Sequence, residues 1–173
     1  MAKSMLNSRH TPRVVVVGAG IGGLVSALVL AHHLASPDLL ATVALAAQAH
    51  GVEPGRIAKT LSFRLNDGRV VLVVARGDAR IDNKKFKDAF GKGKMLGLEE
   101  VSEITGHPVG GVCPFGLANP LPIYLDVSLK IYDIVIPAAG SVNSAVRISP
   151  EKMADITQAE WVDVCQSSET PSP

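Results

Sequence analysis

Three short segments carry residue types that could do chemistry. Lys59 stands in an apolar, strand-like run, Ile57–Leu65, where desolvation lowers a lysine's pKa and sharpens its role. In the loop Gly110–Gly116, two adjacent glycines precede a proline, so backbone N–H groups can converge on an oxyanion or a phosphate. Ala138–Ser141 places small residues after a predicted strand, where a ligand can approach closely. The plainer alternatives are a lysine snorkelling at a sheet edge for Lys59 and an ordinary turn for the glycine loop.

Several familiar catalytic arrangements are missing from the sequence. It contains no Ser-His-Asp order, no paired carboxylates and no HExxH, and His107 beside the glycine loop is more typical of a structural histidine. Cys113 and Cys165 lie 52 residues apart, with no CxxC and no histidine at ligand spacing. A zinc site or a disulfide-stapled scaffold is therefore not indicated, and we expect no metal, no cofactor and a reducing, cytoplasmic compartment.

The composition indicates a globular chain with an uneven distribution of charge. The 173 residues are 47% hydrophobic, 19% charged and only 4% aromatic, so one domain with an aliphatic core is expected. The net charge of +1 conceals a basic middle: residues 56–94 hold eleven Lys/Arg and four Asp, whereas residues 95–173 hold three basic and ten acidic residues. The basic segment is where a polyanion would bind, although Lys84, Lys85 and Lys87 could simply solvate a helix face.

The N-terminal segment has three competing interpretations. Val14–Ala31 is eighteen residues without a charge, and Gly18, Gly20 and Gly23 form the GxGxxG pattern of a dinucleotide site. That fold also needs a second strand ending in an acidic residue, but a helix-like run follows Ser36–Asp38. A signal peptide or membrane span is the second interpretation, and packing against the following domain is the third. Packing is favoured, and no stable membrane association is expected.

The remaining chain predicts an α+β domain with a mixed, largely antiparallel sheet and short helices around it. A hairpin is indicated by Asn66–Asp67–Gly68 between strands 57–65 and 69–75. We divide the chain into an atypical segment 1–40, a domain over 41–166 and a disordered tail over 167–173. The other expected elements are helices over 41–50, 83–90, 98–105 and 150–156, and strands over 123–127, 134–137, 145–148 and 161–164.

Six runs, in order, resemble the YbaK/ProX family of aminoacyl-tRNA deacylases, which is related to the editing domain of bacterial prolyl-tRNA synthetases. The resemblance covers about residues 41–166. It rests on GRIAKTLSF (55–63), VLVVARGDARIDNKKF (71–86), EITGHPVGGVCPFG (103–116), LPIYLDVSL (121–129), AAGSVNSAVRISP (138–150) and EWVDV (160–164). It also implies a curved sheet.

The resemblance implies roles for particular residues. The family's lysine falls on Lys59, its GxxxP loop on Gly110–Pro114, and its small-residue turn on Ala138–Gly140. We therefore expect hydrolysis of the ester between a mischarged amino acid and tRNA, without a metal or a protein nucleophile, the attack coming from water or from the substrate itself. The expected catalytic residues are Lys59, Gly110, Gly111 and Pro114, and the expected substrate-binding residues are Thr60, Val112, Cys113, Ala138, Ala139 and Gly140.

A mechanism follows as a hypothesis. Backbone N–H groups of Gly110–Pro114 would hold the carbonyl, Lys59 would anchor the ester or a nearby phosphate, and segment 56–94 would receive the acceptor end of tRNA. The expected substrate is Cys- or Ala-tRNA specific for proline, and prolyl-tRNA synthetase is a possible partner. Residues 14–40 depart from the family's usual first helix and edge strand, which leaves the amino acid open. A non-catalytic tRNA- or synthetase-binding module, with Lys59 only binding phosphate, and a dinucleotide-binding protein are the alternatives.

Overall fold

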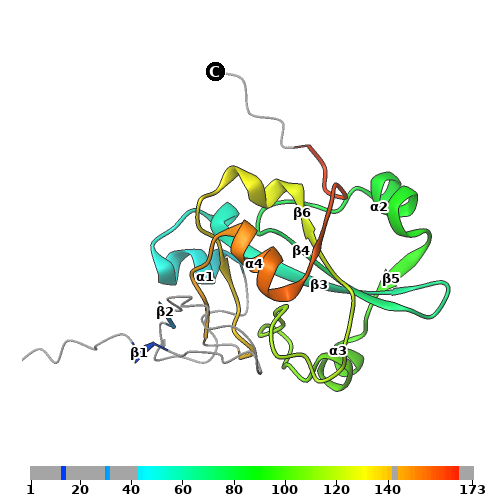
Figure 1. The fold of residues 1–173 in the computed structure, drawn as a ribbon, viewed down its shortest axis with the longest axis horizontal. Helices are drawn as coiled ribbons and strands as arrows, with labels where there is room; N and C mark the ends of the chain where they lie inside the picture. Colours follow the sequence, from blue (N-terminus) through cyan, green and yellow to red (C-terminus); the bar gives the residue numbers. More distant parts are fainter. Residues whose placement is uncertain (1–12, 15–29, 32–42, 142–143, 168–173) are drawn as a thin grey trace, which may run out of the picture.

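The computed structural model describes residues 13–14, 30–31, 43–141 and 144–167. These residues form a mixed sheet of six strands in the order β5-β3-β4-β6-β8, with β7 also paired to β3 (Figure 1). A separate pair joins β1 (Arg13–Val14) to β2 (Leu30–Ala31) in antiparallel register. The predicted α+β class with a mixed sheet is confirmed.

The hairpin of β3 (Ile57–Leu65) and β4 (Val70–Arg76) is the centre of the sheet. Its strands align over seven residue pairs, from Ala58 with Arg76 to Arg64 with Val70. Gly68 has φ +88° in the turn, a conformation that glycine adopts without strain. β4 is buried along Val71–Ala75 because the sheet is covered on both faces there, as its unbroken apolar run indicates.

Shorter strands extend the sheet on both sides of the hairpin. β5 (Gly93–Met95) pairs antiparallel with β3 over three positions. The parallel pairings are β7 (Ile136–Pro137) with β3 over two positions, β6 (Ile123–Asp126) with β4 over three, and β8 (Glu160–Val162) with β6 over three. By aligned positions the sheet is therefore largely antiparallel.

The edge of β3 opposite β4 is only partly paired. β7 covers it at Ile57 and Ala58, and β5 covers it from Phe63 to Leu65. The N–H of Leu96 donates to the carbonyl of Ser62, which extends the β5 side by one contact. Between these two strands, the middle of β3 has no neighbouring strand on this edge among the described residues, and an opening remains in the sheet.

In the described part of the chain, four helices surround the sheet: α1 (Val43–His50), α2 (Asn83–Phe90), α3 (Leu98–Thr105) and α4 (Pro150–Thr157). Two short 3-10 helices, η1 (Pro54–Arg56) and η2 (Val127–Ile131), connect them to strands. Asp82 caps α2 by accepting the N–H groups of residues 84 and 85, and Ser149 caps α4 by accepting that of residue 152. Figure 1 shows α1 toward one end of the sheet and α2 with β5 toward the other.

The core is mainly aliphatic, as the composition predicts, with one aromatic chain. Its largest cluster of buried residues includes Val74, Leu125, Leu129 and Met153. In a second cluster, four aromatic rings form a row in which each contacts the next, with neighbouring centroids 4.6–5.1 Å apart: Phe63, Phe86, Phe90 and Tyr124. A helix as short as α2 is not stable alone, so its packing through these aromatic rings stabilises it on the sheet.

A fully buried carboxylate joins the end of β6 to the end of the described chain. Asp126 Oδ1 accepts the N–H of Ser128 at 2.9 Å, which caps η2. Its Oδ2 accepts the N–H groups of Val164 and Cys165 at 2.8 and 3.1 Å. Three charge-assisted hydrogen bonds compensate for removing the carboxylate from water.

Some expected elements differ from the structure. The expected strand 145–148 forms only isolated bridges, Val135 with Ile148 and Ala138 with Ala145. The expected strand 123–127 stops at Asp126, where η2 begins, and β5 was not expected. The glycine-rich segment 15–29, with its three interpretations, and the predicted tail from residue 168 onward lie outside the described residues. Within the described ranges, no helix is both long and apolar enough to cross a membrane.

Candidate functional site

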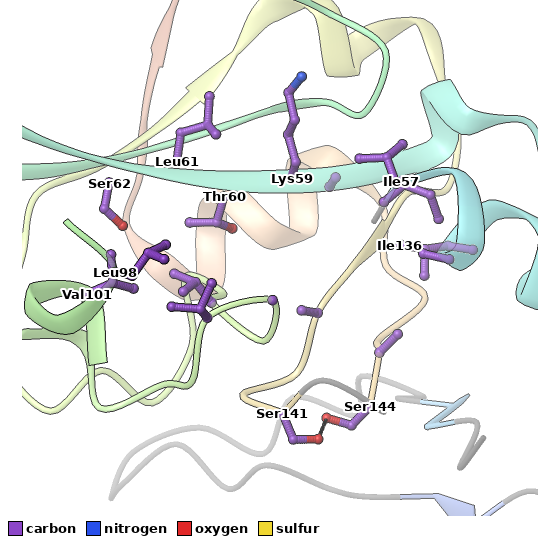
Figure 2. A pocket seen from close by; sticks show the side chains of 18 of the residues that line it. Ile57, Lys59, Thr60, Leu61, Ser62, Leu98, Val101, Ile136, Ser141 and Ser144 are labelled. Carbon is purple, nitrogen blue, oxygen red and sulfur yellow. Dashed lines mark hydrogen bonds between the residues drawn. The ribbon is translucent and has the colours of Figure 1, made fainter. Parts of the chain in front are cut away.

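A cavity of about 270 Å³ lies at the opening on the edge of β3. Its walls come from β3, α1, α3, the glycine loop and the segments on either side of residues 142–143 (Figure 2). Most of the lining is aliphatic, with Val101, Val112, Ile136 and Ala145 among its members. The opening between β5 and β7 therefore creates a small apolar site at the centre of the fold.

Alternation along β3 divides its side chains between two faces. Figure 2 shows Thr60 and Ser62 on the side of Ser141 and Ser144, whereas Lys59 and Leu61 point the other way. Thr60 Oγ1 is buried and has no hydrogen-bond partner among the described residues. A buried hydroxyl without a partner has lost its hydration, so it is available to a ligand in the cavity.

The Lys59 ammonium is engaged on the face of β3 away from the cavity. Its Nζ donates to the carbonyl oxygen of Gly77 at 3.0 Å and also to that of Ala79. Burial lowers the pKa of Lys59, while Cys165 and Asp78 raise it. The backbone of β3 at Lys59 borders the cavity, but the charged group holds the turn that follows β4.

Hydrogen bonds within the described residues leave several backbone donors of the glycine loop unengaged, and two of these belong to residues that line the cavity. The N–H of Gly111 donates to the carbonyl of Pro108 at 2.9 Å, and the N–H of Cys113 faces His107 Nδ1 at 3.5 Å. Pro114 has no N–H. Gly110 and Val112 both line the cavity, and their N–H groups make no hydrogen bond within the described part of the chain.

The glycine loop packs directly on the small-residue turn, so the structure brings the two predicted segments together. A Cβ on Gly111 would stand 2.6 Å from the carbonyl carbon of Ser141 and 2.8 Å from its Cα, too close for any side chain. Gly140, at φ +88°, lies against the ring of His107, where a Cβ would stand 3.4 Å from Cδ2. These contacts hold the loop and the turn at a fixed separation.

The predicted site residues divide into two groups. Five line the cavity: Lys59, Thr60, Gly110, Val112 and Ala138. The others, Gly111, Cys113, Pro114, Ala139 and Gly140, are not among its lining residues. Cys113 is buried behind the loop, its thiol donates to the carbonyl of Phe115 at 3.4 Å, and burial raises its pKa to about 11.

Several lining residues were missed because no motif marks them. Ser62 shares the cavity face with Thr60 by simple strand alternation, which the sequence could have shown. Leu98 and Val101 come from α3, and Ser141 and Ser144 hydrogen-bond through their hydroxyls at 2.7 Å. Across the described residues, no three His, Cys, Asp or Glu side chains gather at a place that could hold a metal ion.

Comparison with known proteins agrees with this architecture. The family profile described as an aminoacyl-tRNA editing domain matches residues 38–156. The chain belongs to the aminoacyl-tRNA editing domain family. As the resemblance implies, this editing domain is of the YbaK-like deacylase type, and its general function is the editing of mischarged tRNA.

Relatives support the assignment over most of the editing domain. The uncharacterised protein YwhH of Bacillus subtilis is 52% identical over 131 residues, covering 75% of this chain and 83% of YwhH. EbsC of Enterococcus faecalis, a candidate Cys-tRNA(Pro)/Cys-tRNA(Cys) deacylase, is 32% identical over 68% of this chain and 73% of its own length. The crystal structure of a candidate trans-editing enzyme for prolyl-tRNA synthetase matches with TM-score 0.72 and 34% identity, over 80% of this chain and 87% of that one.

Proposed function

We propose that the protein is a trans-editing hydrolase that cleaves the ester bond of Cys- or Ala-tRNA specific for proline. One observation carries the proposal: a small apolar cavity bordered by two unengaged backbone donors of the glycine loop, Gly110 and Val112. The cavity would hold the amino acid, and the donors would face the ester at its entrance. The similar solved structure is described as a candidate trans-editing enzyme for prolyl-tRNA synthetase, and we propose this synthetase as the partner.

The two donors would stabilise the charge that develops during ester hydrolysis. When a nucleophile attacks the carbonyl, negative charge accumulates on its oxygen, and preorganised N–H groups lower the energy of that state. The contact of Gly111 with Ser141 keeps the loop from relaxing, so the donors are oriented before the substrate arrives. Gly111 and Pro114 thus serve the site by holding the loop, while Gly110 and Val112 touch the substrate.

The size and chemistry of the cavity favour a small amino acid. At about 270 Å³ it lies just below the range of roughly 300–1,000 Å³ typical of ligand pockets, so it fits an aminoacyl group rather than a nucleotide. Its aliphatic wall suits a methyl or thiol side chain, and Thr60 offers one hydroxyl that can hydrogen-bond. Alanine satisfies the first feature, and cysteine satisfies both.

The attacking group is proposed to come from water or from the substrate. Burial raises the pKa of Cys113 to about 11, which leaves too little thiolate near neutral pH for nucleophilic attack. The Cys113 thiol also points to the Phe115 carbonyl rather than into the cavity. We propose that the reaction needs no metal, which activity in the presence of EDTA would test.

Unpaired cations offer a path for the tRNA backbone. Within the basic segment, five side chains form ion pairs with nearby carboxylates: Arg56, Arg64, Arg69, Arg76 and Lys85. Five others form no ion pair with the described residues: Arg80, Lys84, Lys87, Lys92 and Lys94. This second group follows the chain from the turn after β4 through α2 to β5. We propose that it contacts phosphates, which positions the acceptor end without reading its sequence.

Lys59 enters the proposal as an anchor for the ester or its neighbouring phosphate. Contact with the substrate requires its ammonium to leave the carbonyls of Gly77 and Ala79. Lys59→Ala separates two roles. If Lys59 contacts the substrate, activity falls while the melting temperature is kept; if it only holds the turn after β4, both fall together.

Deacylation of a panel of mischarged tRNAs tests the function. Cys-, Ala- and Ser-tRNA specific for proline are compared with correctly charged Pro-tRNA and Cys-tRNA, using wild-type protein. Selective release of cysteine or alanine is expected. If the folded protein binds tRNA but hydrolyses none of these esters, it is a binding module and the enzymatic proposal fails.

A further inference from the structure

Three large apolar side chains stand exposed around the mouth of the cavity. Met95, Leu98 and Val109 are 58%, 70% and 46% exposed, and all three line the cavity. They come from β5, the start of α3 and the segment before the glycine loop. We call them the apolar rim. The other three exposed large apolar residues of the described chain, Val127, Ile131 and Ile156, are not among the cavity's lining residues.

An apolar rim at a site entrance indicates a ligand that extends out of the cavity. Exposed apolar side chains gathered at one place cost free energy in water and are typical of binding surfaces. At about 270 Å³, the cavity is too small to hold an aminoacyl group and its nucleoside together. Whatever is joined to that group through the ester must therefore lie against the rim.

We propose that the apolar rim binds the terminal adenine of the tRNA, one face of the base lying on Met95, Leu98 and Val109. This inference rests on the proposed function and adds the place of the nucleoside to it. The ester joins the amino acid to the ribose, so the base lies one sugar away from the cavity entrance. A flat, weakly polar base face can remove apolar surface from water by lying against these aliphatic side chains.

The charges near the rim suit the backbone that precedes the adenine. Lys94 adjoins Met95 in β5, Lys92 is two residues before Lys94, and neither forms an ion pair with the described residues. Of the three carboxylates in α3, Glu100 is paired with Arg64 at 2.8 Å, whereas Glu99 beside Leu98 and Glu103 form no ion pair with the described residues, so phosphates are expected on the β5 side of the mouth and not on the α3 side. The preceding phosphates can thus follow β5 away from the mouth.

The binding test does not depend on catalysis. A labelled RNA oligonucleotide ending in CCA is compared with one whose terminal residue lacks its base, using wild-type protein and fluorescence anisotropy. The expected result is about tenfold weaker binding of the abasic strand, because the strand without its base cannot cover the apolar rim. Equal affinity for the two strands overturns the proposal, whether or not the protein hydrolyses esters.

Variants locate the effect at the rim. In the triple variant Met95→Ser, Leu98→Ser, Val109→Ser, the preference for the intact strand should disappear. Ile131→Ser is the matched control, because Ile131 is 65% exposed and does not line the cavity. Circular dichroism and melting establish that both proteins fold. If the triple variant is folded and keeps the wild-type preference, the base binds elsewhere and the proposal fails.

Hydrolysis gives a second, independent comparison. For an active wild type, the triple variant should lose about tenfold more kcat/KM on aminoacyl-adenosine than on the methyl ester of the same amino acid, and the extra loss should come mainly through KM. An equal loss on both substrates means that the rim shapes the amino-acid cavity instead. Unchanged rates on both, with lost binding of prolyl-tRNA synthetase, mean that the rim is a protein-docking surface. Either result overturns the proposal.

Discussion

Thr60→Val should stabilise the free protein and impair recognition of a polar substrate side chain. Thr60 Oγ1 is buried in the cavity wall without a hydrogen-bond partner among the described residues. Valine has nearly the same shape and a higher preference for strands. The substitution therefore removes an uncompensated polar group and leaves the wall of the cavity in place.

The size of both effects can be estimated. An unsatisfied buried hydroxyl costs about 1–3 kcal/mol, so Thr60→Val should add at least about 1 kcal/mol. For a protein of this length that raises the melting temperature by about 2–4 °C. A hydrogen bond from Thr60 to a substrate thiol or hydroxyl contributes about 0.5–1.5 kcal/mol, so the preference for such a substrate over alanine should fall about two- to tenfold.

Differential scanning calorimetry and parallel deacylation of Cys-, Ser- and Ala-tRNA specific for proline measure these effects. Thr105→Val is the matched control. Thr105 is also buried, but its hydroxyl donates to the Val101 carbonyl at 2.6 Å and accepts the N–H of His107 at 3.1 Å. Its loss should lower stability by about 1–3 kcal/mol. If Thr60→Val is destabilised like this control, the Thr60 hydroxyl is bonded in the free protein and is not reserved for substrate.

Three further substitutions or treatments test the contacts around the site. Gly111→Ala should lower the free energy of unfolding by about 1–3 kcal/mol through overpacking, and should lower kcat/KM by at least about tenfold. Gly97→Ala is the control and should keep activity, because its Cβ would meet only an ordinary contact at 3.5 Å. If the two variants melt and deacylate alike, Gly111 is not packed against Ser141 as described. Burial raises the pKa of Cys113 and Cys165 to about 11 and about 12, so both thiols should resist iodoacetamide at pH 8 until guanidinium is added. Stability should decline above about pH 9, because there only the unfolded chain releases the two thiol protons. Rapid alkylation of the native protein would show that the thiols are accessible and would contradict the raised pKa values. Asp126→Asn should lower the free energy of unfolding by about 1.5–3 kcal/mol for each charge-assisted bond lost, and so lower the urea midpoint; an unchanged midpoint would show that these bonds contribute little.

Local sequence signals predicted the parts of the fold that local physics determines. The Asn66–Gly68 turn predicted the hairpin, and Asp82 and Ser149 predicted two helix starts through their caps. β5 was not predicted, because its three residues, Gly93–Met95, are all exposed and have no apolar pattern. Its strand conformation comes from pairing with β3, which is a tertiary contact that a local window does not contain.

The sequence identified the segments that form the site, but not which segments contact each other or which side chains face the cavity. The glycine loop and the small-residue turn were expected to matter, but their contact through Gly111 depends on the fold. Strand alternation places Lys59 and Thr60 on opposite faces, yet only the structure shows that the loop covers the face of Thr60. The rim residues Met95 and Leu98 belong to no motif. A single exposed apolar residue is common, and it indicates a binding surface only when the fold brings others beside it.

The three hydrogen bonds of Asp126 also impose an order on folding during synthesis. The ribosome makes β6 about forty residues before Val164 and Cys165, so the carboxylate emerges without two of its three donors. Enclosing it before they arrive would leave a buried charge short of partners, a state that costs several kcal/mol. A released chain that ends at residue 160 should therefore form its β3–β4 hairpin but leave the β6 side of the sheet open and sensitive to protease.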